Sequence, residues 1–161
     1  MPVFLDDYRK AALDAPHGQD RLKVLEEAWT WLYTPWRHES RVKGAGVDCG
    51  NLVSGVFAGA GLIELPPVLT YPHDFYLHSA DELFVRELEK FCCRVEGDPL
   101  PADVVGFKIG MPTVGHIAIV IRWPVILHSV RPSKQVTLDD VITGPLQRAY
   151  VGVWRLKEWC E

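Results

Sequence analysis

The sequence has few of the features that mark nucleic-acid-binding or membrane proteins. No long run of lysine and arginine occurs and the formal net charge is −4, so the positive surface that a phosphate backbone requires is missing. The longest apolar runs, such as HIAIVIRW at 116–123, are strand-length and fall short of the ~20 residues that span a bilayer. We therefore expect no nucleic-acid partner and no membrane-spanning segment.

Cysteine is also sparse, and its spacing argues against two further classes. The chain has four cysteines and no Cys-x-x-Cys pair, the spacing typical of zinc sites. Cys92 and Cys93 are adjacent, and neighbouring cysteines rarely form an unstrained disulfide. We expect no disulfide framework, and we interpret Cys92, Cys93 and Cys160, which lie among aromatic and apolar neighbours, as packing residues.

The N-terminal segment lacks the pattern of a signal peptide. In MPVFLDDYRKAALDAPHG, acidic residues stand where a signal peptide carries lysines, and no continuous apolar core follows. We therefore expect a protein that is cytoplasmic as synthesised. A length of 161 residues with 48% apolar residues suffices for one substantial core, so we predict that residues 1–161 form a single domain.

Helical periodicity dominates the first half of the chain. Apolar residues recur at helical spacing over 20–33 and again over 49–60, which predicts two amphipathic helices. Asp48 is the N-cap candidate of the second helix, and Gly61 is its C-terminal stop. The segment SADELFVRELEKFCCRV, residues 79–95, opens with a Ser-x-x-Glu capping box and predicts a third helix.

Strand periodicity dominates the second half. Short alternating runs separated by turn residues predict strands over 102–109, 115–123, 125–130, 134–138 and 148–156. Residues 34–47 have no period and contain two glycines, which predicts a loop. Helices followed by neighbouring strands are typical of the α+β class, so we expect the helices to pack on an antiparallel sheet of about five strands.

Cys49 stands on the first turn of the predicted helix over 49–60. The positive end of the helix macrodipole favours a thiolate over a thiol, and the thiolate is the nucleophilic form of cysteine. This placement predicts a reactive Cys49 with a pKa below the usual value of about 8.5. The alternative is that Cys49 is an ordinary core residue, buried on the apolar face of its own helix.

Two histidines lie on the predicted strand faces. If the hairpin closes between Ile121 and Val125, His116 lies opposite Val130 and diagonal to His128 on one face. Two imidazoles side by side could supply a base for a cysteine nucleophile and a residue that orients that base.

A zinc site formed by Asp48, Cys49, His116 and His128 is the rival interpretation of these residues. Adjacent ligands at 48 and 49 would crowd a tetrahedral centre, and the spacing matches none of the usual ligand pairs. We therefore expect no metal and no cofactor.

Four segments together resemble the NlpC-type cell-wall cysteine peptidases, which have a papain-like fold. VDCGNLVSGVFAGAGL resembles the Asp-Cys-Ser-Gly-Leu-Val helix start of that family, and LPADVVGF its Pro-Gly-Asp-Leu-Val-Phe-Phe strand. GHIAIVI resembles the Gly-His-Val-Gly-Ile-Tyr-Ile strand, and ILHS the strand that carries the third catalytic position. The resemblance implies a papain-like fold with Cys49 as nucleophile, His116 as base and His128 as the orienting residue.

The chain departs from the family pattern where those enzymes hold a free substrate amine. Gly50 stands in place of a serine, and Trp36 replaces a tyrosine whose hydroxyl contributes near the reaction centre. We therefore expect Asp48, Trp36 and Tyr33 to be substrate-binding residues, although Tyr33 is near the matching position and not at it. The resemblance also implies a weaker demand for a free amine.

The resemblance implies a hydrolase that cleaves an amide bond in peptidoglycan stem peptides. The segment inserted after the cysteine helix is similar to the phage-tail and prophage branch, which implies phage tail proteins as partners and the virion tail as a location. Two alternatives use the same fold. One is an amidase or acyltransferase on a different acyl substrate, and the other is a tail-assembly protein with a degenerate site.

Overall fold

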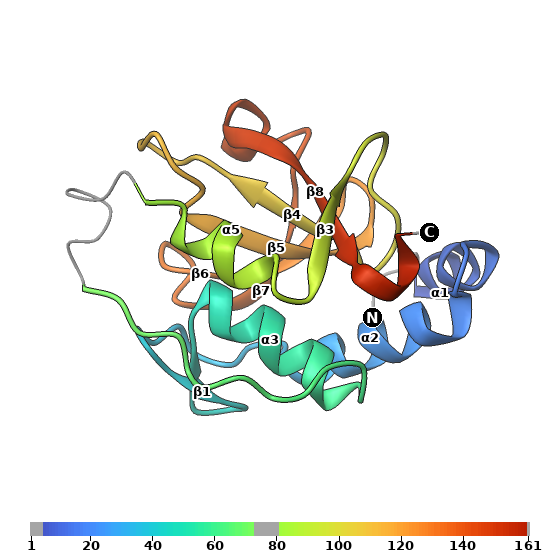
Figure 1. Ribbon diagram of the computed structural model, residues 1–161, viewed down its shortest axis with the longest axis horizontal. Coiled ribbons are helices and arrows are strands. Elements are labelled where there is room, and N and C mark those ends of the chain that lie inside the picture. The colour runs from blue at the N-terminus through green and yellow to red at the C-terminus, as the bar shows by residue number, and fades with distance from the viewer. Residues whose placement is uncertain (1–4, 73–80, 161) are drawn as a thin grey trace.

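A six-stranded antiparallel sheet forms the centre of the protein, whose structure is a computed structural model that describes residues 5–72 and 81–160 (Figure 1). The strands lie in the order β3-β8-β4-β5-β6-β7. Their bounds are β3 Cys92–Val95, β4 Val104–Phe107, β5 His116–Arg122, β6 Val125–Val130, β7 Gln135–Asp140 and β8 Tyr150–Leu156. The α+β class is confirmed, with one strand more than the sequence predicts.

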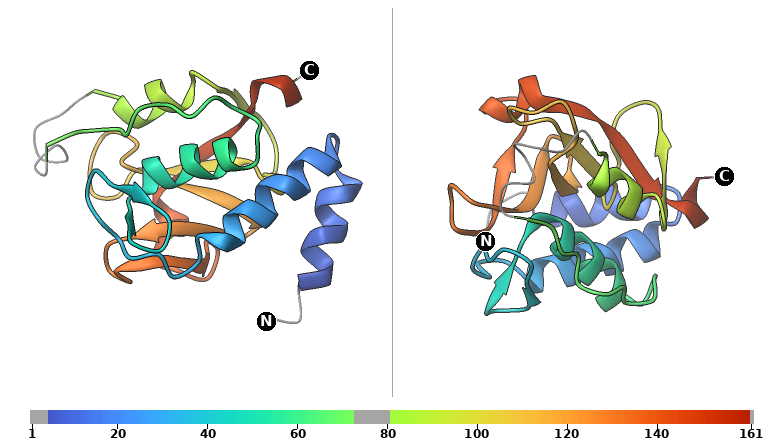
Figure 2. Two further views of the ribbon diagram at one scale, coloured as in Figure 1. Left: turned by 90° about the horizontal axis from the view of Figure 1, so that it is seen from below. Right: turned by 60° about the vertical axis from the view of Figure 1, so that its left-hand side comes forward.

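The helices pack mainly on one side of this sheet. Figures 1 and 2 show α2 and α3 lying next to each other against it, with α1 crossing the far end of α2. The helices are α1 Leu5–Asp14, α2 Gly18–Thr30, α3 Cys49–Gly59 and α5 Leu83–Leu88, with short 3₁₀ turns η1 Pro145–Ala149 and η2 Lys157–Trp159. Two short strands, β1 Arg41–Val42 and β2 Gly46–Val47, pair within the predicted loop. Among the described residues, no helix is long and apolar enough to cross a membrane.

The helix that carries Cys49 begins and ends where the sequence predicts. The Asp48 carboxylate accepts a hydrogen bond from the Asn51 N–H at 3.2 Å, which caps the first turn. Gly61 adopts a φ of +81°, and the Leu62 N–H reaches back to the Phe57 carbonyl at 3.1 Å. The apolar face between these caps is fully buried in the core that β5 completes. Cys49 is therefore held on a rigid element.

The third predicted helix is wrong over most of its length. Only α5 is helical, and the Glu82 carboxylate accepts from the Val114 N–H at 3.1 Å instead of capping its own helix. Ser79, the other half of the predicted capping box, lies outside the described residues. Residues 92–95 leave the helix because they extend the sheet by pairing with β8, with Val95 opposite Val153.

The interpretation of the cysteines as packing residues is wrong for two of them. Cys93 and Cys160 form a disulfide across 67 residues of sequence. The sequence gives no sign of this pairing because Cys93 comes close to the C-terminal segment only once β3 has joined β8. Cys49 and Cys92 remain as free, buried thiols.

A buried ion cluster ties α2 to the sheet. Arg21 and Asp103 are both fully buried, and their Nη1 and Oδ1 atoms lie 2.9 Å apart. Arg155 on β8 donates to both oxygens of the same carboxylate, from Nε at 3.0 Å and from Nη2 at 2.8 Å. A buried charge is tolerated only when it is paired in this way.

Replacing Asp103 by Asn should therefore destabilise the fold strongly, because it leaves the Arg21 guanidinium buried without its counter-ion. We expect the free energy of unfolding to fall by about 3–5 kcal/mol. The matched control is Asp14→Asn, which breaks an exposed pair with Lys10 and should cost at most about 1 kcal/mol. Urea denaturation measures both. Equal losses in the two variants would contradict a structural role for the cluster.

Candidate active site

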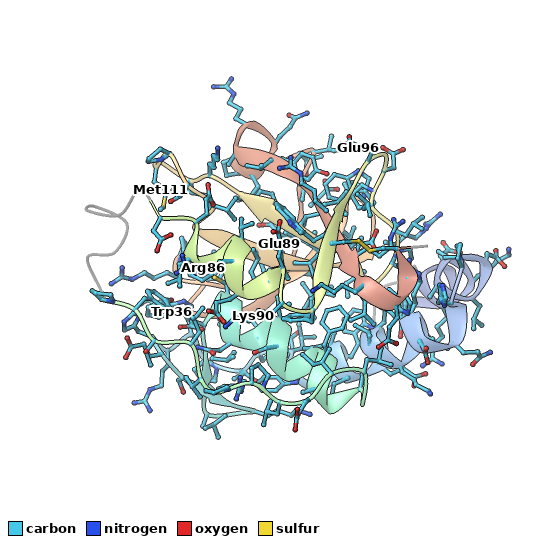
Figure 3. All side chains as sticks on the ribbon, viewed as in Figure 1. Trp36, Arg86, Glu89, Lys90, Glu96 and Met111 are labelled. Carbon is cyan, nitrogen blue, oxygen red and sulfur yellow. A yellow bond between two sulfur atoms is a disulfide. The ribbon has the colours of Figure 1, made fainter. Side chains whose placement is uncertain are left out.

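A pocket of about 220 Å³ opens where the start of α3 meets the ends of β5 and β6. It brings together residues from five separate parts of the chain. Two of them, Trp36 and Met111, are labelled in Figure 3 on the same side of the molecule. The full lining is Trp36, His38, Cys49, Tyr71, Ile109, Met111, Gly115, His116, Ser129, Val130, Arg131 and Pro132.

The two predicted histidines form a direct pair at this pocket. His116 Nε2 lies 2.8 Å from His128 Nδ1, a hydrogen-bond distance. Ile119 pairs with Leu127 and Val120 with Ile126, so the strands have the predicted register. The register shifts by one residue between Val120 and Arg122, which shortens the hairpin loop at that end. The predicted arrangement of His116 and His128 is confirmed.

Burial keeps both imidazoles uncharged. It lowers the pKa of His116 to about 3, with the neighbouring His128 adding to the effect, and it lowers the pKa of His128 to about 4. The Asp139 carboxylate acts in the opposite direction on the pKa of His128. At pH 7 the pair is neutral, and one N–H is shared between the two rings. His116 Nδ1 is the ring nitrogen that this bond leaves for a substrate or a thiol.

Cys49 lines the same pocket, but its environment reverses the predicted direction of its pKa. Burial raises the pKa of the thiol to about 12, and the adjacent Asp48 carboxylate contributes to the rise. The backbone N–H groups of Ile117 and Gly50 favour the thiolate, but to a smaller extent. The expectation of a lowered pKa for Cys49 is therefore wrong. A neutral thiol needs a base at the moment of attack, and His116 lines the same pocket.

Asp48 is buried beneath the pocket and has no free acceptor position. Its Oδ2 accepts from the Glu39 N–H at 2.8 Å and from the Tyr71 hydroxyl at 3.0 Å. Its Oδ1 accepts from the backbone and side-chain N–H groups of Asn51 at 3.2 and 2.8 Å. A carboxylate offers about four acceptor sites, so these bonds occupy all of them. Asp48 holds three segments of the site together rather than lining it.

Of the two aromatic residues predicted to bind substrate, only one lines the pocket. Trp36 lines the pocket, with the Arg131 guanidinium 5.2 Å from its ring centre. Tyr33 is 68% exposed and lies outside the pocket lining, and its backbone N–H donates to the Val136 carbonyl. The structure therefore brings Trp36 but not Tyr33 to the site.

The lining residues that the sequence analysis does not predict include His38, Tyr71 and Arg131. His38 and Tyr71 pack edge to face with ring centres 4.6 Å apart, and both come from segments without periodicity. Arg131 follows β6 immediately, two residues after Ser129. Its position directly after the predicted strand that carries His128 is the one signal that could have pointed to it.

Gly50 has a steric role beside the nucleophile. A Cβ at this position would lie 3.0 Å from the Phe84 ring and 3.2 Å from the Leu69 side chain. Phe84 on α5 thus occupies the space that the family's serine would need.

Residues 5–72 and 81–160 contain no group of three His, Cys, Asp or Glu side chains able to hold a metal ion, so the zinc alternative has no site there.

Comparison with known proteins identifies the fold. No family model and no curated protein match the sequence. An NlpC/P60 family protein from Bacillus cereus is 19% identical over 84% of this chain and 40% of its own, with a TM-score of 0.58. The peptidoglycan hydrolase RipB from Mycobacterium tuberculosis is 17% identical over 89% of this chain and 69% of its own, with a TM-score of 0.57. The fold is that of the NlpC/P60 proteins.

The chain covers different shares of the solved structures that it matches. The chain spans less than half of the Bacillus cereus protein but nearly all of an N-acetylmuramoyl-L-alanine amidase from Bacteroides uniformis. That amidase is 14% identical over 86% of this chain and 99% of its own, with a TM-score of 0.53. The papain-like NlpC-type fold predicted from the motifs is thereby confirmed.

The pKa of Cys49 predicts an unusual pH profile for its alkylation. With a pKa of about 12, the thiolate fraction and the rate of iodoacetamide labelling should rise about tenfold per pH unit between pH 7 and 9. Cys92 is buried away from the pocket and should stay unlabelled in the folded protein. Mass spectrometry of timed samples measures both rates. A Cys49 rate that levels off near neutral pH would show that a thiolate already exists there.

Proposed function

We propose that this protein is a cysteine hydrolase that cleaves an amide bond in peptidoglycan stem peptides. The observation that carries the proposal is the buried His116–His128 hydrogen bond in a pocket that Cys49 also lines. The support from the comparisons is that proteins with the same fold include peptidoglycan hydrolases and an amidase.

The geometry supports acyl transfer through a thioester. The Cys49 sulfur forms a bond to the carbonyl carbon while its proton passes to His116 Nδ1 and the carbonyl π electrons move to oxygen. The carbon–nitrogen bond then breaks, and His116 returns the proton to the leaving amine. Water attacks the thioester with His116 as base and releases the Cys49 thiol. The Cys49 backbone N–H, at the start of α3, is a donor for the oxyanion.

The pocket favours a substrate with a negative charge. Of the lining residues, which all lie in the described part of the chain, Arg131 carries the one permanent charge. Its guanidinium packs near the Trp36 ring, which restricts its orientation. A guanidinium held in this way binds a carboxylate through two parallel hydrogen bonds. Stem peptides carry free carboxylates, which agrees with the proposed substrate.

Turnover of stem peptides tests the proposed function directly. We expect mass spectrometry to show cleaved products from peptidoglycan fragments with the native protein and none with Cys49→Ala. His116→Ala should lower the rate roughly 10²–10⁴-fold, because proton transfer has lost its base. Cys92→Ala is the matched control, since it removes the other free thiol without touching the pocket. Products that persist in Cys49→Ala would contradict the proposal, as would a native protein inactive on every fragment.

The hydrogen bonds of Asp48 predict little discrimination for a free N-terminal amine. All acceptor sites of its carboxylate are occupied, and Trp36 offers no hydroxyl at the pocket. An amine left without one partner costs roughly 1–3 kcal/mol, which lowers the discrimination for a free amine by about 5- to 150-fold, so we expect the free and the N-acylated peptide to be accepted comparably. Rates on a stem peptide and on its N-acetylated form measure the preference. A ratio above a thousandfold would show that another group binds the amine.

The other two functions considered from the sequence use the same fold. An amidase or acyltransferase on a different acyl substrate would label Cys49 normally but leave stem peptides intact. A degenerate tail-assembly protein would keep the fold and show no turnover. Delivery on a phage tail rests on the sequence resemblance and stays a prediction.

A further inference from the structure

His128 Nε2, at the end of the histidine pair away from His116, is a polar atom that the proposed mechanism does not use. His128 is completely buried, and its Nδ1 is taken by His116. Its Nε2 is buried too, and no hydrogen-bond partner for it occurs among the described residues. A buried imidazole nitrogen without a hydrogen-bond partner costs desolvation free energy, and such atoms are rare in folded proteins.

A carboxylate on the neighbouring strand faces this atom. Asp139 Oδ2 lies 3.5 Å from His128 Nε2. In the β6–β7 register His128 pairs with Thr137 and Ile126 with Asp139, so Asp139 is diagonal to His128 on the same face. The other oxygen, Oδ1, accepts from the Asp140 N–H at 2.8 Å, which turns Oδ2 toward the ring. The side chain of Asp139 is 44% exposed, so the carboxylate is in contact with water.

The contacts from His116 through His128 to Asp139 determine which nitrogen of each imidazole carries the hydrogen. To accept the Cys49 proton, His116 Nδ1 must be free of hydrogen, so the hydrogen of the neutral ring sits on Nε2. That N–H donates to His128 Nδ1, which must then be the acceptor, and the His128 hydrogen sits on Nε2. An ionised carboxylate can only accept, so a carboxylate beside Nε2 selects this arrangement in both rings.

We propose that Asp139 is a positioning residue that fixes the tautomer of His128 and, through it, the free Nδ1 of His116. The inference rests on the proposed function for its role in catalysis, while the tautomer itself is a property of the resting protein. Asp139 does not line the pocket that contains Cys49. Asp139 is the last of four groups in a row, which are Cys49, His116, His128 and Asp139. Its carboxylate supplies a negative charge that a neutral histidine cannot supply.

Electrostatics during the reaction support the same role. When His116 accepts the thiol proton, the histidine pair becomes positively charged inside a buried site. A second neutral imidazole stabilises that charge less than a carboxylate does. Asp139 provides the carboxylate at the end of the pair away from His116, and it already raises the pKa of His128 against the effect of burial.

Asp139→Asn is the sharpest test because it should reverse the tautomer. The amide oxygen can keep the bond from the Asp140 N–H, which places the NH₂ group beside His128 Nε2. That group donates, so His128 should move its hydrogen to Nδ1 and donate to His116 Nε2. His116 then carries its hydrogen on Nδ1 and is no longer a base. Nitrogen-15 NMR of histidine-labelled protein reads both tautomers without any substrate.

We expect the native protein to show Nε2–H on His116 and His128, and Asp139→Asn to show Nδ1–H on both. The rate constant kcat on stem peptides should fall about 100-fold in Asp139→Asn with KM unchanged, within the range for misplaced proton transfer. In Asp139→Ala neither tautomer is selected, and the fall should be about tenfold. Asp139→Glu keeps a carboxylate and should restore the Nε2–H form.

Asp140→Asn is the matched control, because it removes a half-buried negative charge one residue away on the same strand, and its amide oxygen can keep the bonds from the Ile142 and Thr143 N–H groups. It should leave the tautomers and kcat within twofold of the native protein. The inference is overturned if Asp139→Asn keeps both Nε2–H signals, or if its kcat matches that of Asp140→Asn. Because NMR requires no turnover, a protein inactive on stem peptides would refute the proposed function while the tautomers still decide the role of Asp139.

Discussion

The hydrogen bond between two buried imidazoles is the constraint on which the site depends. Each neutral ring has one donor and one acceptor nitrogen, and inside the protein both need partners. The bond between His116 and His128 forms only if β5 and β6 keep their register, since a slip of one residue would turn one ring to the opposite face of the sheet. The apolar residues of these strands therefore do more than fill the core. They hold the two imidazoles at hydrogen-bond distance.

Asp48 imposes a second constraint from the other side of the pocket. Its carboxylate binds the segment at Glu39, the segment at Tyr71 and the first turn of α3, so three parts of the chain converge on one buried charge. Burial raises the pKa of Asp48, and the hydrogen bonds from Glu39 and Tyr71 oppose that rise. A group that satisfies four donors within the protein cannot also hold a substrate amine. Here a residue position that matches the family motif serves the architecture of the site.

The sequence predicts those parts of the structure that local periodicity and caps determine. The helix from Cys49 and the register of the His116 hairpin follow from apolar spacing and turn residues, and both are confirmed. The helix α1 has no such signal, because only Tyr8 and Ala12 of its described side chains are fully buried. Residues 92–95 continue a helical pattern, and pairing with β8 overrides that preference.

What the sequence cannot supply are features created by long-range packing. His38 and Tyr71 reach the pocket from irregular segments, and the disulfide joins residues brought together by the outer strands. The direction of the Cys49 pKa belongs to this group as well. The helix start favours a thiolate, but the sequence does not reveal how completely the folded chain would bury the sulfur.

The final arrangement of charge explains how a site that is neutral at rest can still support proton transfer. In the proposed reaction, moving the Cys49 proton to His116 creates a negative centre beside the start of α3 and a positive centre on the histidine pair. The positive end of the α3 dipole lies next to the negative centre, and the Asp139 carboxylate lies next to the His128 ring of the positive centre. Both groups are fixed before the reaction, so they stabilise the charge-separated state without reorganisation. Burial thus suppresses charge in the resting site, while the groups at its two ends favour charge of the correct sign during attack.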